Sequence, residues 1–331
     1  MTIDFAEILL ARQRISASVL RTPQREAKSL SARLGVPVQL KCEHHQTTGS
    51  FKLRGATNAV LSLDRAQRDA GVVAASTGNH GRALAHAAAA AGAKAVICMS
   101  RLVPDNKVQA IEALGAEIRI VGNSQDDAQV EVDRLALEAG MTPVPPFDHA
   151  AVIAGQGTLG LEMLEDAPQT TTVLVPLSGG GLLAGVALAL RTLNPAIRII
   201  GVTMENGAAM QASLVAGQPV AVEEVPTLAD SLGGGIGLAN RYTFPMVRDL
   251  VDEVVLVSEA EIAEAMRAAY FEESEALEGA AAVGIAALDA DKVTLTGPAV
   301  VLLSGKNIDM TLHRRIMAGE NPDLAAEHGH G

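Results

Sequence analysis

The chain has 331 residues, a formal charge of −12 and an apolar fraction of 48%. A domain usually takes roughly 100 to 200 residues, so this length predicts two domains or one large α/β unit. The apolar fraction is that of an ordinary globular protein and excludes disorder over most of the length. The acidic balance argues against a nucleic-acid partner, because phosphate backbones are bound by clustered Lys and Arg.

Export and membrane insertion are not expected. The N-terminus, MTIDFAEILLARQRI, has acidic residues where a secretion signal has basic ones. Residues 173–190 are uncharged, but Pro176 and three glycines interrupt them, which favours strand, loop and helix over a membrane span. Cys42 and Cys98 have no spacing typical of a metal site or a disulfide framework, so we expect a reducing cytoplasm and no membrane partner.

Apolar, β-rich runs alternate with Ala-rich helical stretches, which is typical of parallel sheets with crossover helices. Gly92 and Gly115 stand where helices end, and Pro104 stands where one begins. The elements expected first are strands at 72–76, 93–100 and 117–122 and helices ending at Gly92, at 104–114 and at 125–139.

The prolines of TPVPPFD mark a boundary near residue 148. The pattern then restarts with a strand at 172–176, a glycine loop, a helix to about Leu193 and a strand at 197–203. We therefore expect a small α/β domain at 70–148 and a larger one made of 1–69 and 149–320. Residues 321–331 have little to bury and are expected to form a tail.

The segment SGGGLLAG at 178–185 follows a predicted strand and begins a predicted helix. Small residues there let consecutive backbone N–H groups point at one anion, and the helix dipole adds to the attraction. The loop therefore predicts a phosphate site without basic side chains. A turn without ligand stays open, as does a dinucleotide site with Glu205 on the ribose, because Gly179, Gly181 and Ala184 fit G-x-G-x-x-A.

The segment STGNHG at 76–81 is a second polar loop between a strand and a helix. Its hydroxyl and N–H groups suit a carboxylate, and Asn79 offers both a donor and an acceptor. A helix cap is the alternative, but it explains one polar residue rather than a run that includes His80. His80 and His86 do not indicate zinc, because no second group of ligands accompanies them.

Two more polar loops are ADSLGGGIG at 229–237 and LLSGKN at 302–307. Ligands of α/β proteins gather at strand ends. These loops, with the Ser-Phe-Lys of TGSFKLRGA at 48–56, therefore predict a closed pocket for a ligand that carries a phosphate. The chain has neither the G-x-S-x-G of acyl hydrolases nor a Walker loop, which excludes those two classes.

In this order, TGSFKLRGA, STGNHG, SGGGL and LLSGKN resemble the serine/threonine dehydratase family of fold type II pyridoxal-phosphate (PLP) enzymes, which also contains serine racemase. The resemblance covers essentially the whole chain, including VIAGQGT at 152–158 and RDLVDEV at 248–254. It implies two parallel-sheet α/β domains like those of the tryptophan synthase β subunit. A dinucleotide site, and with it an NAD-dependent oxidoreductase, leaves the Ser-Phe-Lys segment unexplained.

The resemblance implies roles around the cofactor ring. Lys52 holds PLP covalently through its amine, and Phe51 packs against the ring. Asn79 bonds the ring hydroxyl, Ser304 faces the pyridine nitrogen, and Glu278, in EGAAA, lies beside the ring.

It also implies two further groups of contacts. The phosphate is expected on a loop of five residues: Ser178, Gly179, Gly180, Gly181 and Leu182. The substrate is expected on a second set, in which Thr77 also acts as a catalytic residue beside Lys52: Ser76, Thr77, Gly78 and His80.

The implied chemistry is elimination. An amino acid replaces Lys52 on the cofactor, the freed amine takes the α-proton, and PLP spreads the resulting charge. A hydroxyl on the next carbon leaves as water, and the product hydrolyses to a keto acid and ammonia. Serine at 304 stabilises a charged ring nitrogen less than a carboxylate does, so we expect elimination to be favoured over racemisation.

Several positions depart from the family pattern. Thr77 stands where racemases of the family have serine, and its restricted rotamer argues against racemisation. Glu205 and Ala209 match two ligands of a divalent-metal site in some members, but Gln211 replaces the second acid, so we expect no metal. Lys306 replaces a glycine, and the sequence gives no reason for it.

The HHQTTGSFKLRGA and ADSLGGGIG segments look closest to the dehydratase associated with hydroxyectoine breakdown, a branch of this family. The sequence thus predicts a cytoplasmic PLP-dependent lyase acting on a small 3-hydroxy amino acid, threonine- or serine-like or derived from hydroxyectoine. A serine or hydroxyaspartate racemase of the same fold and a non-catalytic PLP-binding protein are the alternatives. The resemblance also implies a homodimer.

Overall fold

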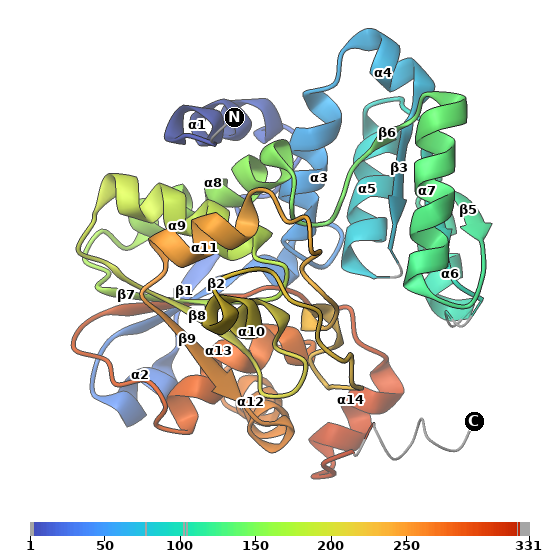
Figure 1. The fold of residues 1–331 in the computed structure, drawn as a ribbon. Helices are drawn as coiled ribbons and strands as arrows, with labels where there is room; N and C mark the ends of the chain where they lie inside the picture. The colour runs from blue at the N-terminus through green and yellow to red at the C-terminus, as the bar shows by residue number, and fades with distance from the viewer. Residues whose placement is uncertain (1–2, 77, 102, 104, 323, 325–331) are drawn as a thin grey trace.

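The computed structural model describes residues 3–76, 78–101, 103, 105–322 and 324. Within these ranges the chain forms two β-sheets, of six and four strands, each flanked by helices (Figure 1). The predicted α/β class with two parallel sheets is confirmed.

The larger sheet brings together strands from both ends of the chain. Its order is β1 (Gln24–Glu26), β2 (Val38–Cys42), β10 (Ala299–Leu303), β7 (Thr172–Pro176), β8 (Arg198–Met204) and β9 (Glu253–Val257). Neighbouring strands are parallel except β1 with β2. All residues of β7 and β10 are buried, as expected for parallel strands covered on both faces.

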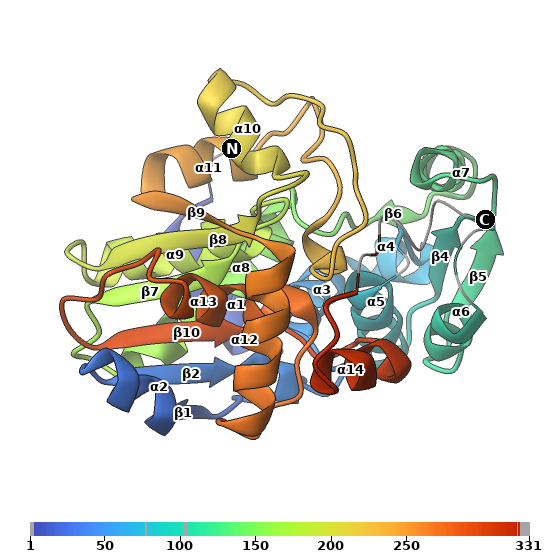
Figure 2. The same cartoon turned by 90° about the horizontal axis from the view of Figure 1, so that it is seen from below.

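Helices cover both faces of this sheet (Figures 1 and 2). One face carries α1 (Phe5–Ile15), α8 (Ala150–Asp166), α9 (Gly181–Leu193) and α11 (Thr243–Leu250), and the other carries α2 (Lys28–Leu34), α12 (Glu259–Phe271), α13 (Gly279–Asp289) and α14 (Met310–Met317). Successive strand residues point to opposite faces. Val173 and Val175 therefore pack in the core with α8 and α9, whereas Leu174 packs with α12 and α13.

The smaller sheet is parallel throughout and comes from one continuous part of the chain. Its order is β5 (Glu117–Ile120), β4 (Ala95–Met99), β3 (Val72–Ala75) and β6 (Thr142–Pro143). Its core is shared with α5 (Asn79–Ala90) and α6 (Asp105–Glu112) on one side and with α7 (Gln125–Ala139) on the other. Gly92 and Gly115 have φ of +67° and +90°, as predicted for residues that follow helices, and Pro104 lies outside the described residues.

The strands of the smaller sheet fall within 72–143, and those of the larger sheet fall within 24–42 and 172–303. On this basis we propose the domain division 70–148 against 1–69 with 149–320. Most of the expected tail at 321–331 lies outside the described residues.

Helix α3 (Lys52–Leu61) is held tightly against α8. A Cβ atom on Gly155 would lie 2.7 Å from the carbonyl oxygen of Arg54, so only glycine allows this approach. The Arg54 side chain is 1% exposed and pairs with Glu43 at 2.8 Å and Glu162 at 2.6 Å. The first turn of α3, which begins with Lys52, is therefore fixed by packing and by ion pairs.

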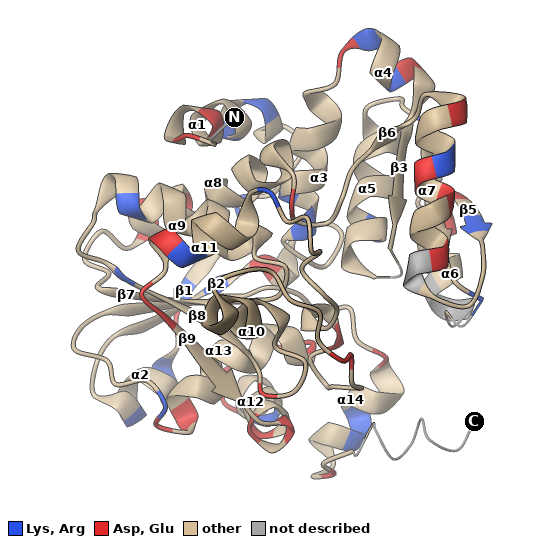
Figure 3. Cartoon of the chain, viewed as in Figure 1, with Lys and Arg blue, Asp and Glu red and all other residues tan. Residues whose placement is uncertain are grey.

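The remaining elements connect the sheets and cover the surface: η1 (Glu43–His45), α4 (Arg65–Ala70), α10 (Ala209–Ala216) and η2 (Asp230–Leu232). Acidic and basic side chains are mixed along α7, where Arg134 pairs with both Glu131 and Glu138 (Figure 3). No helix in the described ranges has the length and apolar character needed to cross a membrane.

Candidate active site

The predicted ligand loops meet at one pocket, formed where loops following strands of both sheets come together. Its lining residues are Phe51, Lys52, Asn79, Phe147, Pro176, Ser178, Gly179, Gly180, Gly181, Leu182, Ser231, Leu232, Glu278, Ala280 and Ser304. Strands β7 and β10 are neighbours in the larger sheet, so the loops after them are brought to the same edge.

Lys52 places an amine in this pocket. Its Nζ donates a hydrogen bond to the carbonyl oxygen of Pro146 at 2.8 Å. Removal of the ammonium group from water lowers the pKa of Lys52 to about 8, and the charge of Glu278 opposes this shift. A larger neutral fraction near neutral pH makes this amine a better nucleophile and base than a lysine in water.

The Ser-Phe-Lys segment is hydrogen-bonded to the loop after β10. The N–H of Phe51 donates to the carbonyl of Ser304 at 3.0 Å, and the N–H of Lys306 donates to the carbonyl of Gly49 at 3.0 Å. The Phe51 ring centroid lies 5.2 Å from Nζ of Lys52. Two loops from opposite ends of the sequence are therefore fixed to each other, with buried Ser304 on the pocket wall.

The glycine loop has no space for side chains. A Cβ on Gly179 would lie 2.4 Å from the ring of Phe147, and one on Gly181 would lie 2.9 Å from the Cα of Phe147. Gly180 has a φ of +87°, a conformation that favours glycine. Because α9 begins at Gly181, the unpaired N–H groups of its first turn are available to an anion in the pocket.

Glu278 lies at the centre of a buried polar network. Its carboxylate accepts hydrogen bonds from Nδ2 of Asn79 at 2.8 Å and from the N–H of Asn307 at 3.1 Å. Nδ2 of Asn307 in turn donates to Oδ1 of Asn79 at 2.6 Å. Burial raises the pKa of Glu278 to about 7, the charge of Asp230 adds to the rise, and the bond from Asn79 opposes it.

The residues expected to bind substrate lie at the first turn of α5, outside the pocket lining. Oγ of Ser76 accepts from the N–H of Gly81 at 3.0 Å, and Gly78 is the N-cap. His80 is buried, its Nε2 is 2.7 Å from the carbonyl oxygen of Val144, and burial lowers its pKa to about 3. A substrate role for this turn stays a prediction.

The predicted catalytic residue Thr77 lies outside the described residues. Nothing in the structure bears on its hydroxyl group.

The expected remnant of a metal site lies away from the pocket, after β8. Glu205 and Gln211 line a separate cavity, and α10 begins at Ala209. Nζ of Lys292 lies 3.4 Å from Oε1 of Glu205 and 2.7 Å from Oε2 of Glu261. A fixed ammonium group thus stands beside the one acidic residue of the expected ligand set.

Sequence reasoning missed Phe147 as a wall of the pocket. The segment TPVPPFD was interpreted as a domain boundary, although Phe147 is one of only five phenylalanines in the chain. An aromatic residue in a chain that otherwise avoids them, directly after two prolines, was the available signal.

Comparison with known proteins agrees with this pocket. Residues 15–305 match the family model described as pyridoxal-phosphate dependent enzyme. A putative threonine dehydratase of Sinorhizobium fredii is 61% identical over 96% of both chains. The L-threonine ammonia-lyase of Thermotoga maritima is 40% identical over 95% of this chain and 78% of its own.

Solved structures show the same fold. Maize serine racemase superposes with a TM-score of 0.90 at 35% identity and full coverage of both chains. A bacterial threonine deaminase, from T.th., superposes with a TM-score of 0.86 at 36% identity, over 92% of this chain and 99% of its own.

Proposed function

The chain belongs to the family of pyridoxal-phosphate dependent enzymes, and we propose that this PLP-dependent lyase removes water and then ammonia from a small 3-hydroxy amino acid of the threonine and serine class. The observation that carries the proposal is the amine of Lys52 in one pocket with the glycine loop, Asn79 and Ser304. No other arrangement of the described residues combines a neutralised amine with an anion-binding loop.

The pocket fits the phosphate of PLP. The loop 178–182 has no charged side chain, so binding rests on backbone N–H donors and on the N-terminal dipole of α9. Any Cβ on Gly179 or Gly181 would collide with Phe147. We assign the phosphate to Ser178, Gly179, Gly180, Gly181 and Leu182.

The remaining wall fits the ring. We propose that Phe51 packs against the ring, that Asn79 bonds its hydroxyl group under the control of Glu278, and that Ser304 faces its nitrogen. When bound, PLP supplies an electron sink for the charge left on the substrate's α-carbon. A serine hydroxyl is a neutral partner for the nitrogen, so this chain keeps that sink moderate.

Lys52 performs the proton transfer. With a pKa of about 8 in the pocket, the amine is basic enough to take the α-proton and is partly neutral at physiological pH. The Pro146 carbonyl and the fixed first turn of α3 orient this amine. Loss of the β-hydroxyl then competes with return of the proton to the α-carbon.

A racemase is the second candidate, because maize serine racemase shares the fold over the whole chain. We propose that racemisation is the minor path. Thr77 takes the place of the serine expected in racemases, and Ser304 leaves only a moderate sink. Both features favour expulsion of the hydroxyl over reprotonation.

The substrate follows the relatives' names in class only. We propose threonine or serine first, with a hydroxyectoine-derived amino acid as the branch-specific alternative suggested by HHQTTGSFKLRGA. A cytoplasmic location, a homodimer, and the absence of nucleic-acid partners are further proposals. Size-exclusion chromatography with light scattering tests the homodimer.

Purified holoenzyme is to be assayed for keto-acid release from serine, threonine, 3-hydroxyaspartate and hydroxyectoine-derived amino acids. We expect turnover of at least one, lost in Lys52→Ala. Bound PLP with no keto acid from any of them would leave a non-catalytic binding protein.

A further inference from the structure

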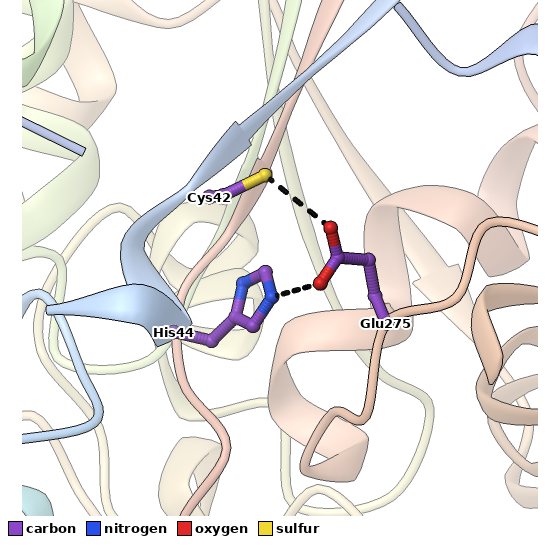
Figure 4. Close-up of side chains that lie close together, drawn as sticks. All are labelled: Cys42, His44 and Glu275. Carbon is purple, nitrogen blue, oxygen red and sulfur yellow. Dashed lines mark hydrogen bonds and ion pairs between the residues drawn. The ribbon is translucent and has the colours of Figure 1, made fainter. Parts of the chain in front are cut away.

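A second cluster of reactive side chains lies outside the pocket, at the end of β2. Cys42 ends this strand, His44 and His45 form η1 directly after it, and Glu275 lies in the connection between α12 and α13. Figure 4 shows Sγ of Cys42 and the ring of His44 directed at the carboxylate of Glu275. None of these residues lines the pocket.

The donor atoms are close enough to share one ion. Oε2 of Glu275 is 2.6 Å from Nε2 of His44 and 3.0 Å from Nε2 of His45, and Oε1 is 3.8 Å from Sγ of Cys42. Donor atoms of Cys42, His44 and Glu275 all lie within 4.8 Å of one another. Tetrahedral zinc, with bonds of roughly 2.0 to 2.3 Å, holds its donors about 3.3 to 3.8 Å apart. Small shifts therefore separate the observed geometry from a zinc site.

The second coordination layer is also in place. Nη2 and Nε of Arg25 lie 2.8 and 2.9 Å from Oε1 of Glu275, which leaves Oε2 directed at the histidines. Ligating carboxylates are commonly oriented by such an outer hydrogen bond. Arg25 also pairs with Glu273 at 3.3 Å.

The charges leave room for a cation. Glu273 and Glu275 are two largely buried carboxylates that share one guanidinium, that of Arg25, while the ammonium of Lys306 is exposed to solvent. With neutral imidazoles the buried group therefore carries one net negative charge. A divalent ion that displaces the proton of the Cys42 thiol adds one net positive charge and makes the group neutral.

Hydrogen bonds alone do not satisfy the cluster. If both imidazoles donate Nε2–H to Glu275, Nδ1 of His44 is buried without a partner among the described residues. Sγ of Cys42 has only long contacts, 3.5 Å to the carbonyl of Leu40 and 3.8 Å to Glu275. His44 is 1% exposed and Cys42 is fully buried, so water does not replace these partners freely.

We propose that Cys42, His44 and Glu275 bind a zinc ion and that His45, with its side chain 42% exposed, supplies the fourth ligand. One thiolate, two imidazoles and one carboxylate form a donor set typical of zinc. Binding forms the Zn–S bond and releases the thiol proton to solvent. The proposal departs from the sequence-based expectation of no metal, because Glu275 is 231 residues from His44 and no spacing pattern connects them.

The ion would brace the active site without entering it. The histidines precede the Ser-Phe-Lys loop by a few residues, and Glu275 precedes Glu278 by three. Zinc at this point links the first strand end to the segment that carries Glu278. Its expected effect is on stability rather than on the chemistry.

The test uses the full-length holoenzyme after treatment with chelator and desalting. Zinc is added, unbound metal is removed, and bound zinc is measured by mass spectrometry. We expect one zinc per chain in the parent and in Cys98→Ser, and none in Cys42→Ser. Cys98 is the matched control because it is also a buried free thiol, in the other sheet.

Three additions keep the result unambiguous. Glu275→Gln is a second loss variant in case Cys42→Ser does not fold, and circular dichroism checks both. A variant with His328→Ala and His330→Ala excludes binding by the C-terminal HGH segment and should keep its zinc. Zinc-edge X-ray absorption should show one sulfur at about 2.3 Å with nitrogen and oxygen neighbours at about 2.0 Å. Equal zinc in the parent and Cys42→Ser, no zinc in the parent, or no sulfur neighbour each overturns the proposal.

Discussion

The side-chain amide of Asn79 donates to the carboxylate of Glu278 at 2.8 Å, joining the first turn of α5 to the start of α13 across 199 positions of sequence. Asn79 comes from the smaller sheet and Glu278 from a helix on the larger one. This bond therefore sets the distance between the two halves of the pocket, and it places a carboxyl group of raised pKa inside it.

Glu278 is expected to make the cofactor-free protein less stable as the pH rises. Its pKa is about 7 in the folded chain against 4.5 in water, so the folded state binds the proton more tightly. Its contribution is fully present below about pH 4.5 and is lost by about pH 7, at an order of about 3 kcal/mol. Denaturant titrations of parent and Glu278→Gln between these values should differ in slope, and parallel curves would remove Glu278 from this role.

Covalent attachment of PLP is expected at Lys52. Borohydride reduction of the holoenzyme followed by peptide mapping should place the pyridoxyl group on this residue, and Lys52→Ala should lose roughly 100-fold or more in kcat. Lys306→Ala is the matched control, because Lys306 is an exposed lysine on the adjoining loop. Label at another lysine in the parent would disprove the assignment.

Phosphate binding by backbone donors is tested at Gly180. Gly180→Asp adds a negative charge at the loop and a Cβ 2.8 Å from Cε of Met210, so PLP should be lost on dialysis. Gly217→Asp is the control, because Gly217 has a comparable φ of +72° and open space around it. It should keep PLP while losing about 1 to 2 kcal/mol of stability. Equal retention of PLP by both variants would place the phosphate elsewhere.

Magnesium is not expected to activate the enzyme. Lys292 already places an ammonium group beside Glu205, and Gln211 offers no charge to a hard cation. Adding magnesium to zinc-replete enzyme should leave kcat and KM unchanged. Strong activation that disappears in Glu205→Gln would show that the altered site still binds a functional cation.

The regular elements were predictable from sequence because each depends on local pattern. The strand at 72–75, the helix at 125–139 and the glycines after helices were read from apolar runs, capping residues and turns. The glycine loop and Lys52 also carry local motifs. Their roles in the pocket come from the family resemblance and stay proposals.

Long-range partners were not predictable. Nothing near His80 in the sequence indicates its bond to the carbonyl of Val144, and nothing near Phe147 indicates that it closes over Gly179. The same holds for Glu275 beside His44. Each of these contacts is chosen by how two sheets and their connections pack, and single-sequence periodicity does not record that packing.

The partition between elimination and inversion tests the central claim most directly. Holoenzyme is incubated in heavy water with L-threonine or L-serine, and keto acid, ammonia and inverted amino acid are followed together. The proposed function predicts keto acid and ammonia in equal amounts, formed faster than the inverted amino acid and absent with Lys52→Ala. Inversion that outpaces keto-acid formation, or keto acid that persists without Lys52, would contradict it.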